Sequence, residues 1–277
     1  MTSAKTQLLA LLGHPVDHSR SPAIHTAAIE ALGLDAAYLA FDVAPADVGA
    51  AIAGLRAIGA RGANVTVPHK QAVMPFLDAI EPAAAAIGAV NTIVRDGDRL
   101  VGANTDAPGL VRSLTEAGFD PTGAHVLVVG AGGAARAAVV GLAEAGAAHV
   151  TVAARRRVAA EALATLAVPA PVRAVELAAL PLAKVDLLVQ ATSATLNVDI
   201  DDGFARTLSL DALPDHATVI DLVYAPLETT VLRAARARGL RTIDGLGMLV
   251  WQAALAFERW LGAAPPIEAM REAALGR

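Results

Sequence analysis

The feature that most constrains the fold is the alternation of short apolar runs with helix-like segments along the chain. In the first part, strands are expected over residues 7–12, 37–42 and 62–66, with helices over 22–32 and 46–58 between them. Strands that alternate with helices in this way pair in parallel, with the helices lying on the faces of the sheet. The sequence therefore predicts an α/β fold.

A second alternating series begins near residue 125 and predicts a second α/β unit. Asp96-Gly97 lies between two short apolar runs, which is typical of a tight hairpin and interrupts the first series. After residue 245 the chain is helical to about 260, and Pro265-Pro266 separates a last helix over 267–275. We expect one domain over 1–105 and 246–277, with the closing helices returning to it, and a second domain over 106–245. Within that second domain we expect strands over 125–129, 149–153, 186–190 and 218–221, and helices over 134–145, 158–166 and 229–238.

Composition narrows the classes of function. The 277 residues are 55% hydrophobic and 18% charged, which excludes disorder, and 27 acidic against 22 basic residues give no overall attraction to nucleic acid. The absence of cysteine removes disulfides and thiol chemistry, and the first residues lack a signal-peptide pattern, so we expect a cytoplasmic protein. The seven histidines lack ligand-like spacing, so no metal is expected. Glycines and charges interrupt the longest apolar stretch, which argues against a membrane span.

A glycine turn between an expected strand and helix predicts a dinucleotide site. Residues 126–129 form an apolar run, and Gly130-Ala131-Gly132-Gly133-Ala134 follows immediately. Glycines allow the backbone to approach a pyrophosphate, whose charge is stabilised by the amides and the positive end of the helix. The alternative is an ordinary tight turn, because a glycine trio alone is a weak signal.

The end of the next expected strand indicates which dinucleotide binds. That strand leads into Arg155-Arg156-Arg157, and no carboxylate is present to bind the ribose 2′-hydroxyl of NAD. Arginine guanidinium groups match a 2′-phosphate, so the sequence favours NADP(H). A solvated basic start of a helix is the alternative interpretation.

Three polar clusters interrupt the apolar first domain. The first, residues 13–22, holds Ser19 and Ser21, two hydroxyls that could face one carboxylate; the second, residues 64–70, holds Lys70; the third, residues 88–92 and 102–109, holds Asp106. Each has an ordinary explanation, because Ser21 and Asp106 could cap helices and a lysine is usually on the surface. A shared functional role for Lys70 and Asp106 requires that folding bring the two side chains together, which their spacing in the sequence does not show.

These clusters, in this order and followed by the glycine turn, residues 221–226 and residues 245–252, resemble the shikimate dehydrogenase family (shikimate/quinate dehydrogenases) over nearly the whole chain. The resemblance implies that the first domain is an α/β substrate-binding domain and the second a Rossmann NADP-binding domain. It also implies that Lys70 and Asp106 are the catalytic pair. It implies a substrate site formed by Ser19, Ser21, Thr66, Lys70, Asn91, Asp106, Tyr224 and Gln252. It further implies a cofactor site formed by Gly130, Ala131, Gly132, Gly133, Ala134, Arg155, Arg156, Thr192, Leu222, Gly245 and Met248.

The implied activity is the reversible NADPH-dependent reduction of 3-dehydroshikimate to shikimate, in aromatic amino acid biosynthesis through chorismate. The implied partner is this small molecule, and the chain would be a monomer or homodimer. Three residues depart from the family pattern: Ala154 and Gln190 stand where asparagine is usual, and Thr195 where glycine is usual. The alternatives are a quinate/shikimate dehydrogenase paralogue and a non-catalytic NADP-binding sensor. A serine hydrolase would need a Gly-x-Ser-x-Gly turn, which the sequence lacks.

Overall fold

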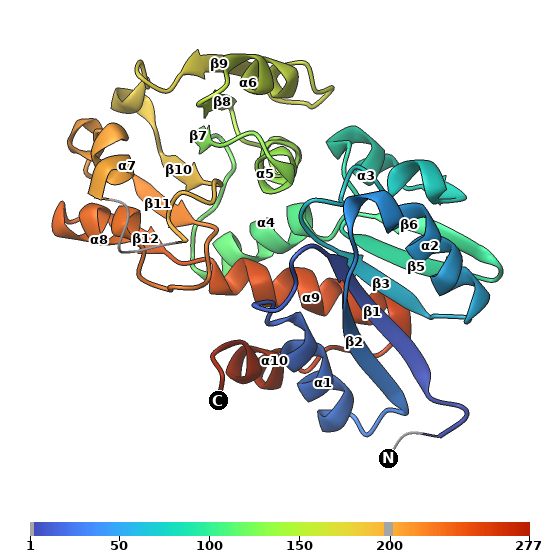
Figure 1. Ribbon diagram of the computed structural model, residues 1–277. Coiled ribbons are helices and arrows are strands. Elements are labelled where there is room, and N and C mark those ends of the chain that lie inside the picture. The colour runs from blue at the N-terminus through green and yellow to red at the C-terminus, as the bar shows by residue number, and fades with distance from the viewer. Residues whose placement is uncertain (1–2, 197–201) are drawn as a thin grey trace. The chain divides into compact units, whose positions relative to one another are not determined.

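The computed structural model describes residues 3–196 and 202–277, which form two compact units (Figure 1). One unit comprises the chain up to Gly109 together with Val250–Arg277, and the other comprises Leu110–Leu249. The divisions fall inside two helices, α4 (Asp106–Glu116) and α9 (Leu246–Leu261), a few residues after the boundaries expected from the sequence. The return of the closing helices to the first unit agrees with the expected α/β architecture.

The first unit is built on a six-stranded sheet in the order β2-β1-β3-β5-β6-β4. β1 pairs in parallel with both β2 and β3, whereas β5 runs antiparallel to β3 and to β6. The hairpin expected at Asp96-Gly97 joins β5 to β6, and Gly97 takes the positive φ of 58° that such a turn favours. The strands are β1 (Gln7–Gly13), β2 (Ala36–Asp42), β3 (Gly62–Val65), β4 (Ala79–Ile80), β5 (Thr92–Asp96) and β6 (Arg99–Ala103).

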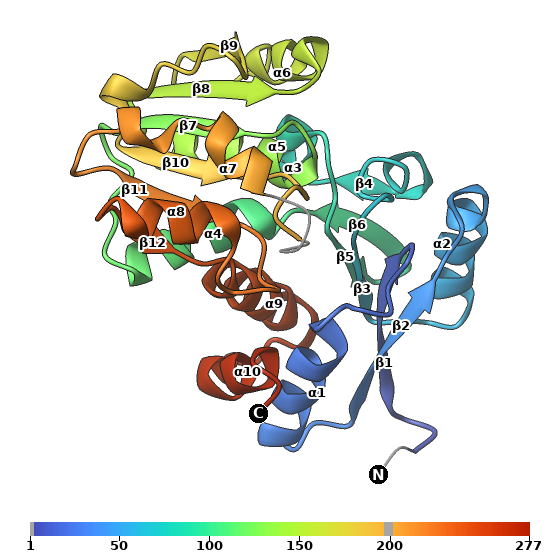
Figure 2. The same ribbon diagram turned by 60° about the vertical axis from the view of Figure 1, so that its left-hand side comes forward.

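Helices cover this sheet and supply its core. α2 (Val48–Ala57) and α3 (Pro82–Ile87) pack their apolar side chains against β1, β3 and β5. α1 (Ser21–Ala31) contacts α10 (Ile267–Ala274), and Figure 2 shows these two helices side by side. Trp260, near the end of α9, has no exposed surface and donates its indole N–H to the carbonyl of Ile93 at 2.8 Å. This buried contact ties the end of α9 to the sheet.

The second unit holds a wholly parallel six-stranded sheet in the order β12-β11-β10-β7-β8-β9. Counted from β7, this is the strand order of the Rossmann fold, so the expected fold class is confirmed. The sequence does not predict β9 and β12, because each is an edge strand without a continuous apolar run. The strands are β7 (His125–Val129), β8 (His149–Ala154), β9 (Val172–Glu176), β10 (Leu187–Gln190), β11 (Thr218–Asp221) and β12 (Arg241–Ile243). The remaining helices are α5 (Gly133–Glu144), α6 (Arg157–Ala164), α7 (Asp202–Thr207) and α8 (Thr230–Ala237). In the described parts of the chain, no helix combines the length and apolar character needed to cross a membrane.

Candidate active site

The polar clusters of the first unit leave the sheet at one edge. β1 and β3 are parallel, so their carboxyl ends lie together, and the loops after them carry Ser19, Thr66 and Lys70. β5 runs the other way and begins at this edge, where Thr92 pairs with Asn64 on one side and with Ala103, the last residue of β6, on the other. The topology therefore brings together segments far apart in the sequence.

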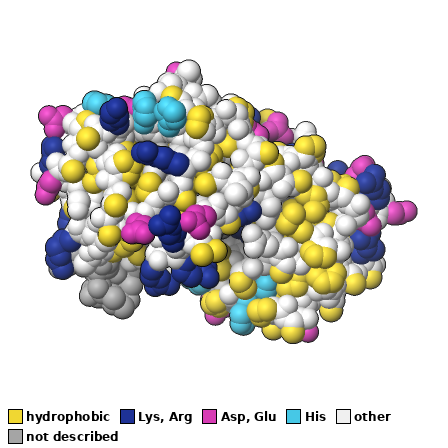
Figure 3. Space-filling model, turned by 90° about the horizontal axis from the view of Figure 1, so that it is seen from above, with side chains coloured by type: hydrophobic (Ala, Val, Ile, Leu, Met, Phe, Trp, Pro, Cys, Tyr) yellow, Lys and Arg dark blue, Asp and Glu magenta, His cyan; other side chains and the backbone are white. Residues whose placement is uncertain are grey.

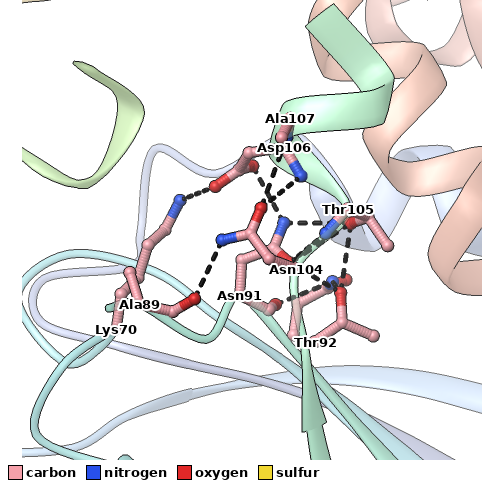
Figure 4. Close-up of polar contacts among 9 residues, drawn as sticks. Lys70, Ala89, Asn91, Thr92, Asn104, Thr105, Asp106 and Ala107 are labelled. Carbon is pink, nitrogen blue, oxygen red and sulfur yellow. Dashed lines mark hydrogen bonds and ion pairs between the residues drawn. The ribbon is translucent and has the colours of Figure 1, made fainter. Parts of the chain in front are cut away.

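Lys70 and Asp106 form an ion pair at this edge (Figure 4). The Lys70 ammonium donates to the Asp106 carboxylate at 2.6 Å, across 36 positions of sequence. The lysine side chain keeps 18% of its surface exposed and the aspartate 7%, so the pair is mostly shielded while Lys70 stays reachable from solvent. Folding therefore brings Lys70 and Asp106 into direct contact, which neither an isolated surface lysine nor an isolated helix cap would explain.

Asp106 is not the cap of its helix. The side-chain oxygen of Asn104 accepts from the backbone N–H of Asp106 at 3.0 Å and of Ala107 at 3.3 Å, which is the capping role. The Asn104 amide in turn donates to the carbonyl of Ala89 at 3.0 Å. Because Asn104 caps α4, the Asp106 carboxylate is available to Lys70.

Asn91 fixes the second oxygen of Asp106. Its amide donates to that oxygen at 2.8 Å, and its own carbonyl accepts from the backbone N–H of Thr105 at 2.7 Å and from the hydroxyl of Thr92 at 2.9 Å. Asn64 donates to the backbone carbonyl of Asn91 at 3.3 Å. All of these residues are buried. They form a rigid frame that holds Asp106, and thereby Lys70, in one orientation.

Ser19 and Ser21 lie in the loop between β1 and α1. The Ser19 hydroxyl accepts from the backbone N–H of Ser21 at 3.3 Å. Ser21 is the first residue of α1 and not its cap, since Arg20 holds that position without a side-chain capping bond. The Ser21 hydroxyl contacts Tyr38, whose pKa is raised by burial, and Tyr38 donates to Asn64 at 2.7 Å. Ser21 thus lies beside Tyr38, which is hydrogen-bonded to Asn64 of the frame around Asp106.

The other residues expected at the substrate are divided between the units. Thr66 directly follows β3, and its backbone N–H donates to the carbonyl of Leu12 at 2.9 Å. Gln252 lies on α9 within the first unit, where its backbone approaches Gly109 so closely that a Cβ there would lie 2.8 Å from the Gln252 nitrogen. Tyr224 follows β11 in the second unit.

The glycine turn of the second unit has the geometry of a dinucleotide loop. Gly130 has a φ of 130°, and a Cβ at this position would lie 2.8 Å from the carbonyl oxygen of Ala191, so only glycine fits. Gly132 is the N-cap of α5, and a Cβ there would meet nothing within 4 Å. Gly133 and Ala134 begin α5, whose first backbone N–H groups lack intrahelical partners. The turn thus offers open space in front of unsatisfied amides, which suits a pyrophosphate.

Arg155 and Arg156 line the same cavity as this turn. The cavity has a volume of about 370 Å³ and is bordered by Gly130, Ala131, Gly132, Thr192 and both arginines, among others. Both arginine side chains are exposed, and within residues 3–196 and 202–277 neither forms an ion pair.

Arg157, the third arginine of the run, behaves differently. It pairs with Glu161 at 2.8 Å and Glu176 at 2.9 Å. On the left of Figure 3, dark-blue Lys and Arg side chains gather on the surface, some of them between magenta acidic ones. Two arginines at the cavity are therefore available for a 2′-phosphate, while the third is neutralised within the protein, a distinction that the sequence alone does not make. The residues present fit NADP(H).

The remaining residues expected at the cofactor follow the carboxyl ends of β10, β11 and β12. Leu222 and Gly245 touch closely, because a Cβ on Gly245 would lie 2.6 Å from the carbonyl oxygen of Leu222. Met248 is 7% exposed and packs in the core of the unit. Among the described residues, no group of three or more histidine or acidic side chains could hold a metal ion.

Comparisons with known proteins agree with this arrangement. The family described as the shikimate dehydrogenase substrate binding domain matches residues 11–93, the shikimate / quinate 5-dehydrogenase family matches residues 113–245, and the shikimate 5'-dehydrogenase C-terminal domain matches residues 245–275. A shikimate dehydrogenase (NADP(+)) of Moorella thermoacetica is 49% identical over 275 residues, covering 96% of this chain and 92% of that protein.

Two solved structures extend the likeness to the fold. Shikimate 5-dehydrogenase from Thermus thermophilus, in complex with NADP(H) and shikimate, superposes with a TM-score of 0.87 at 41% identity, over 98% of this chain and 99% of that one. Quinate dehydrogenase from Corynebacterium glutamicum, in complex with NAD, superposes with a TM-score of 0.90 at 33% identity, over 98% and 99%. The chain therefore belongs to the shikimate dehydrogenase family.

Proposed function

We propose that this protein catalyses the reversible NADPH-dependent reduction of 3-dehydroshikimate to shikimate, a step of aromatic amino acid biosynthesis through chorismate. The observation that carries the proposal is the partly buried Lys70–Asp106 ion pair held by Asn91. It is the arrangement expected of a positioned proton donor beside a reacting carbonyl. Curated relatives with nearly full-length matches are NADP-linked shikimate dehydrogenases, which supports the same reaction.

The chemistry requires one hydride and one proton. The hydride for the carbonyl carbon of the substrate would come from NADPH when this cofactor is bound. The Lys70 ammonium stabilises the negative charge that develops on the carbonyl oxygen and donates the proton that completes the hydroxyl. The Lys70 amine can then regain a proton from water, because 18% of the Lys70 side chain is exposed to solvent. Asp106 orients the ammonium through its 2.6 Å contact and accepts from a substrate hydroxyl.

The remaining substrate contacts are those that the family resemblance implies. Ser19 and Ser21 would bind the substrate carboxylate together with Tyr224, since hydroxyl donors suit an anion that must also be released. Thr66, Asn91 and Gln252 would bind the ring hydroxyls. The first unit thus acts as the substrate domain, with boundaries at about residues 105 and 246.

The cofactor contacts are proposed for the second unit. Residues 130–134 would hold the pyrophosphate, Arg155 and Arg156 the 2′-phosphate, and Thr192, Leu222, Gly245 and Met248 the remainder of the cofactor. Arg155 and Arg156, which line the cavity and form no ion pair with the residues that the structure describes, favour NADP(H) over NAD, because NAD lacks the phosphate that they match. The protein would act as a monomer or homodimer, which light scattering after gel filtration determines.

The experiment that tests the proposal measures absorbance at the NADPH band in four parallel reactions. Shikimate or quinate is offered with NADP⁺ or NAD to the purified protein. Rapid reduction with shikimate and NADP⁺ alone is the expected result. Turnover of quinate, or use of NAD, would favour the quinate/shikimate paralogue. No turnover by protein that binds NADP⁺ would favour the sensor and refute the proposed reaction.

A further inference from the structure

The loop after β10 is held by the side chain of Gln190, the last residue of that strand. The Gln190 carbonyl oxygen accepts from the backbone N–H of Thr192 at 2.6 Å, and its amide donates to the backbone carbonyl of Thr192 at 3.0 Å. One side chain thus satisfies both backbone groups of Thr192, much as a neighbouring strand would. Gln190 has no exposed surface, so water does not compete for these bonds.

The same amide group connects this loop to the end of β11. It donates to the Thr195 hydroxyl at 2.9 Å and to the Asp221 carboxylate at 3.2 Å. Asp221 also accepts from the Val223 backbone at 3.0 Å and from the Thr229 hydroxyl at 2.7 Å. Burial raises the pKa of the Asp221 carboxyl, an effect that these hydrogen bonds oppose. Gln190 is therefore anchored to a buried polar group that is itself fixed by several bonds.

The loop that Gln190 holds is part of the cavity beside the glycine turn. Thr192, Ser193 and Ala194 border that cavity together with Arg155 and Arg156. The loop also packs directly on Gly130, where a Cβ would lie 2.8 Å from the Ala191 carbonyl oxygen and 3.2 Å from the Thr192 side chain. A displacement of the loop by about one ångström would therefore change both the cavity and the glycine turn.

We infer that Gln190 is a positioning residue for the cofactor, which sets the cavity border formed by residues 192–194 through its two bonds to Thr192. Gln190 is buried beneath the loop and acts through Thr192 without touching the cofactor. The identity of the ligand rests on the proposed function, whereas the clamp on Thr192 rests on the hydrogen bonds of the second unit.

The test compares Gln190→Asn with Gln7→Asn by calorimetric titration with NADP⁺. Asparagine is one methylene shorter and cannot reach both backbone groups of Thr192, while Gln7 is exposed in the first unit and provides the same chemical change as a control. We expect Gln190→Asn to raise the Kd for NADP⁺ about tenfold, the effect of about one lost net hydrogen bond. Gln7→Asn should leave it within about twofold of wild type.

Steady-state kinetics separate positioning from general damage to the fold. The KM for NADP⁺ should rise with the Kd, while the KM for shikimate stays within about twofold, because most of the substrate residues lie in the other unit. Thr195→Val, which removes the hydroxyl partner of Gln190 at nearly constant volume, should weaken NADP⁺ about threefold. It provides the deciding measurement if Gln190→Asn does not fold.

Two outcomes would overturn the inference: folded Gln190→Asn that binds NADP⁺ as wild type does, or, where that variant does not fold, Thr195→Val that binds as wild type does. Wild-type protein that binds NADP⁺ without oxidising shikimate would refute the proposed reaction and leave the clamp standing. Wild-type protein that does not bind NADP⁺ would refute both.

Discussion

Replacing Arg155 and Arg156 together with alanine should remove the preference for NADP(H). A charge-assisted hydrogen bond to a phosphate contributes about 1.5–3 kcal/mol, but both side chains are exposed and screened by salt, so about 1 kcal/mol each is the appropriate figure. The two together give about 2 kcal/mol, or about a 30-fold increase in the Kd for NADPH. The Kd for NAD should not change, because NAD has no phosphate at this position.

The assay is titration of each variant with NADPH and with NAD, repeated at low and high salt. Arg157→Ala is the matched control, because this neighbouring arginine is already paired with Glu161 and Glu176. It should leave both affinities within about twofold of wild type. The affinity of wild type for NADPH should fall with salt more steeply than that of the double variant. Equal losses for NADPH and NAD, or a larger loss in Arg157→Ala, would refute the assignment of the phosphate site.

Two further predictions concern the first unit. Asn91→Ala should lower the free energy of unfolding, measured by urea denaturation, by about 2–3 kcal/mol, and it should also lower kcat. The reason is that the change leaves two buried partners of Asn91, the Asp106 carboxylate and the Thr105 backbone N–H, without their hydrogen bonds. Unchanged stability and kcat would show that the frame around Asp106 is not needed. His25 is fully buried, and burial lowers its pKa from 6.5 to about 3. Below pH 6.5 the unfolded chain binds a proton at His25 that the folded protein does not, so this residue should cost about 1.4 kcal/mol of stability per pH unit as the pH falls from about 6 towards 4. In His25→Phe, which keeps an aromatic ring against Tyr38, that part of the pH dependence should be absent, and identical unfolding curves against pH for the two proteins would contradict it.

Much of the fold follows from local sequence pattern. β7 and β11 match their expected ranges, and most other long elements differ by one or two residues, because apolar period and glycine or proline boundaries are local signals. β9 and β12 could not be expected in this way. They lie at the two edges of the sheet and lack a continuous apolar run, so only tertiary pairing defines them.

The site depends more heavily on tertiary structure. Lys70 and Asp106 were expected to meet only because the chain resembles a known family, since spacing alone does not bring position 70 to position 106. Asn64 and Thr105 were part of the polar clusters without a role, and their function in holding Asn91 becomes visible only when β3, β5 and β6 align.

The structural role of the residues that depart from the family pattern also becomes visible only in the tertiary structure. Gln190 and Thr195 differ from the usual residues at two separate positions. In the structure the two residues are in direct contact, because the Gln190 amide donates to the Thr195 hydroxyl at 2.9 Å.

The measurement that tests the central claim most directly is the turnover of Lys70→Met with shikimate and NADP⁺, made on protein whose NADP⁺ affinity is measured in the same preparation. Methionine keeps the length and packing of the side chain while removing its charge and its proton. If Lys70 is the proton donor, kcat should fall by about 10²–10⁴-fold while the Kd for NADP⁺ stays within about twofold of wild type. A folded Lys70→Met protein that turns over within about tenfold of wild type would contradict the account.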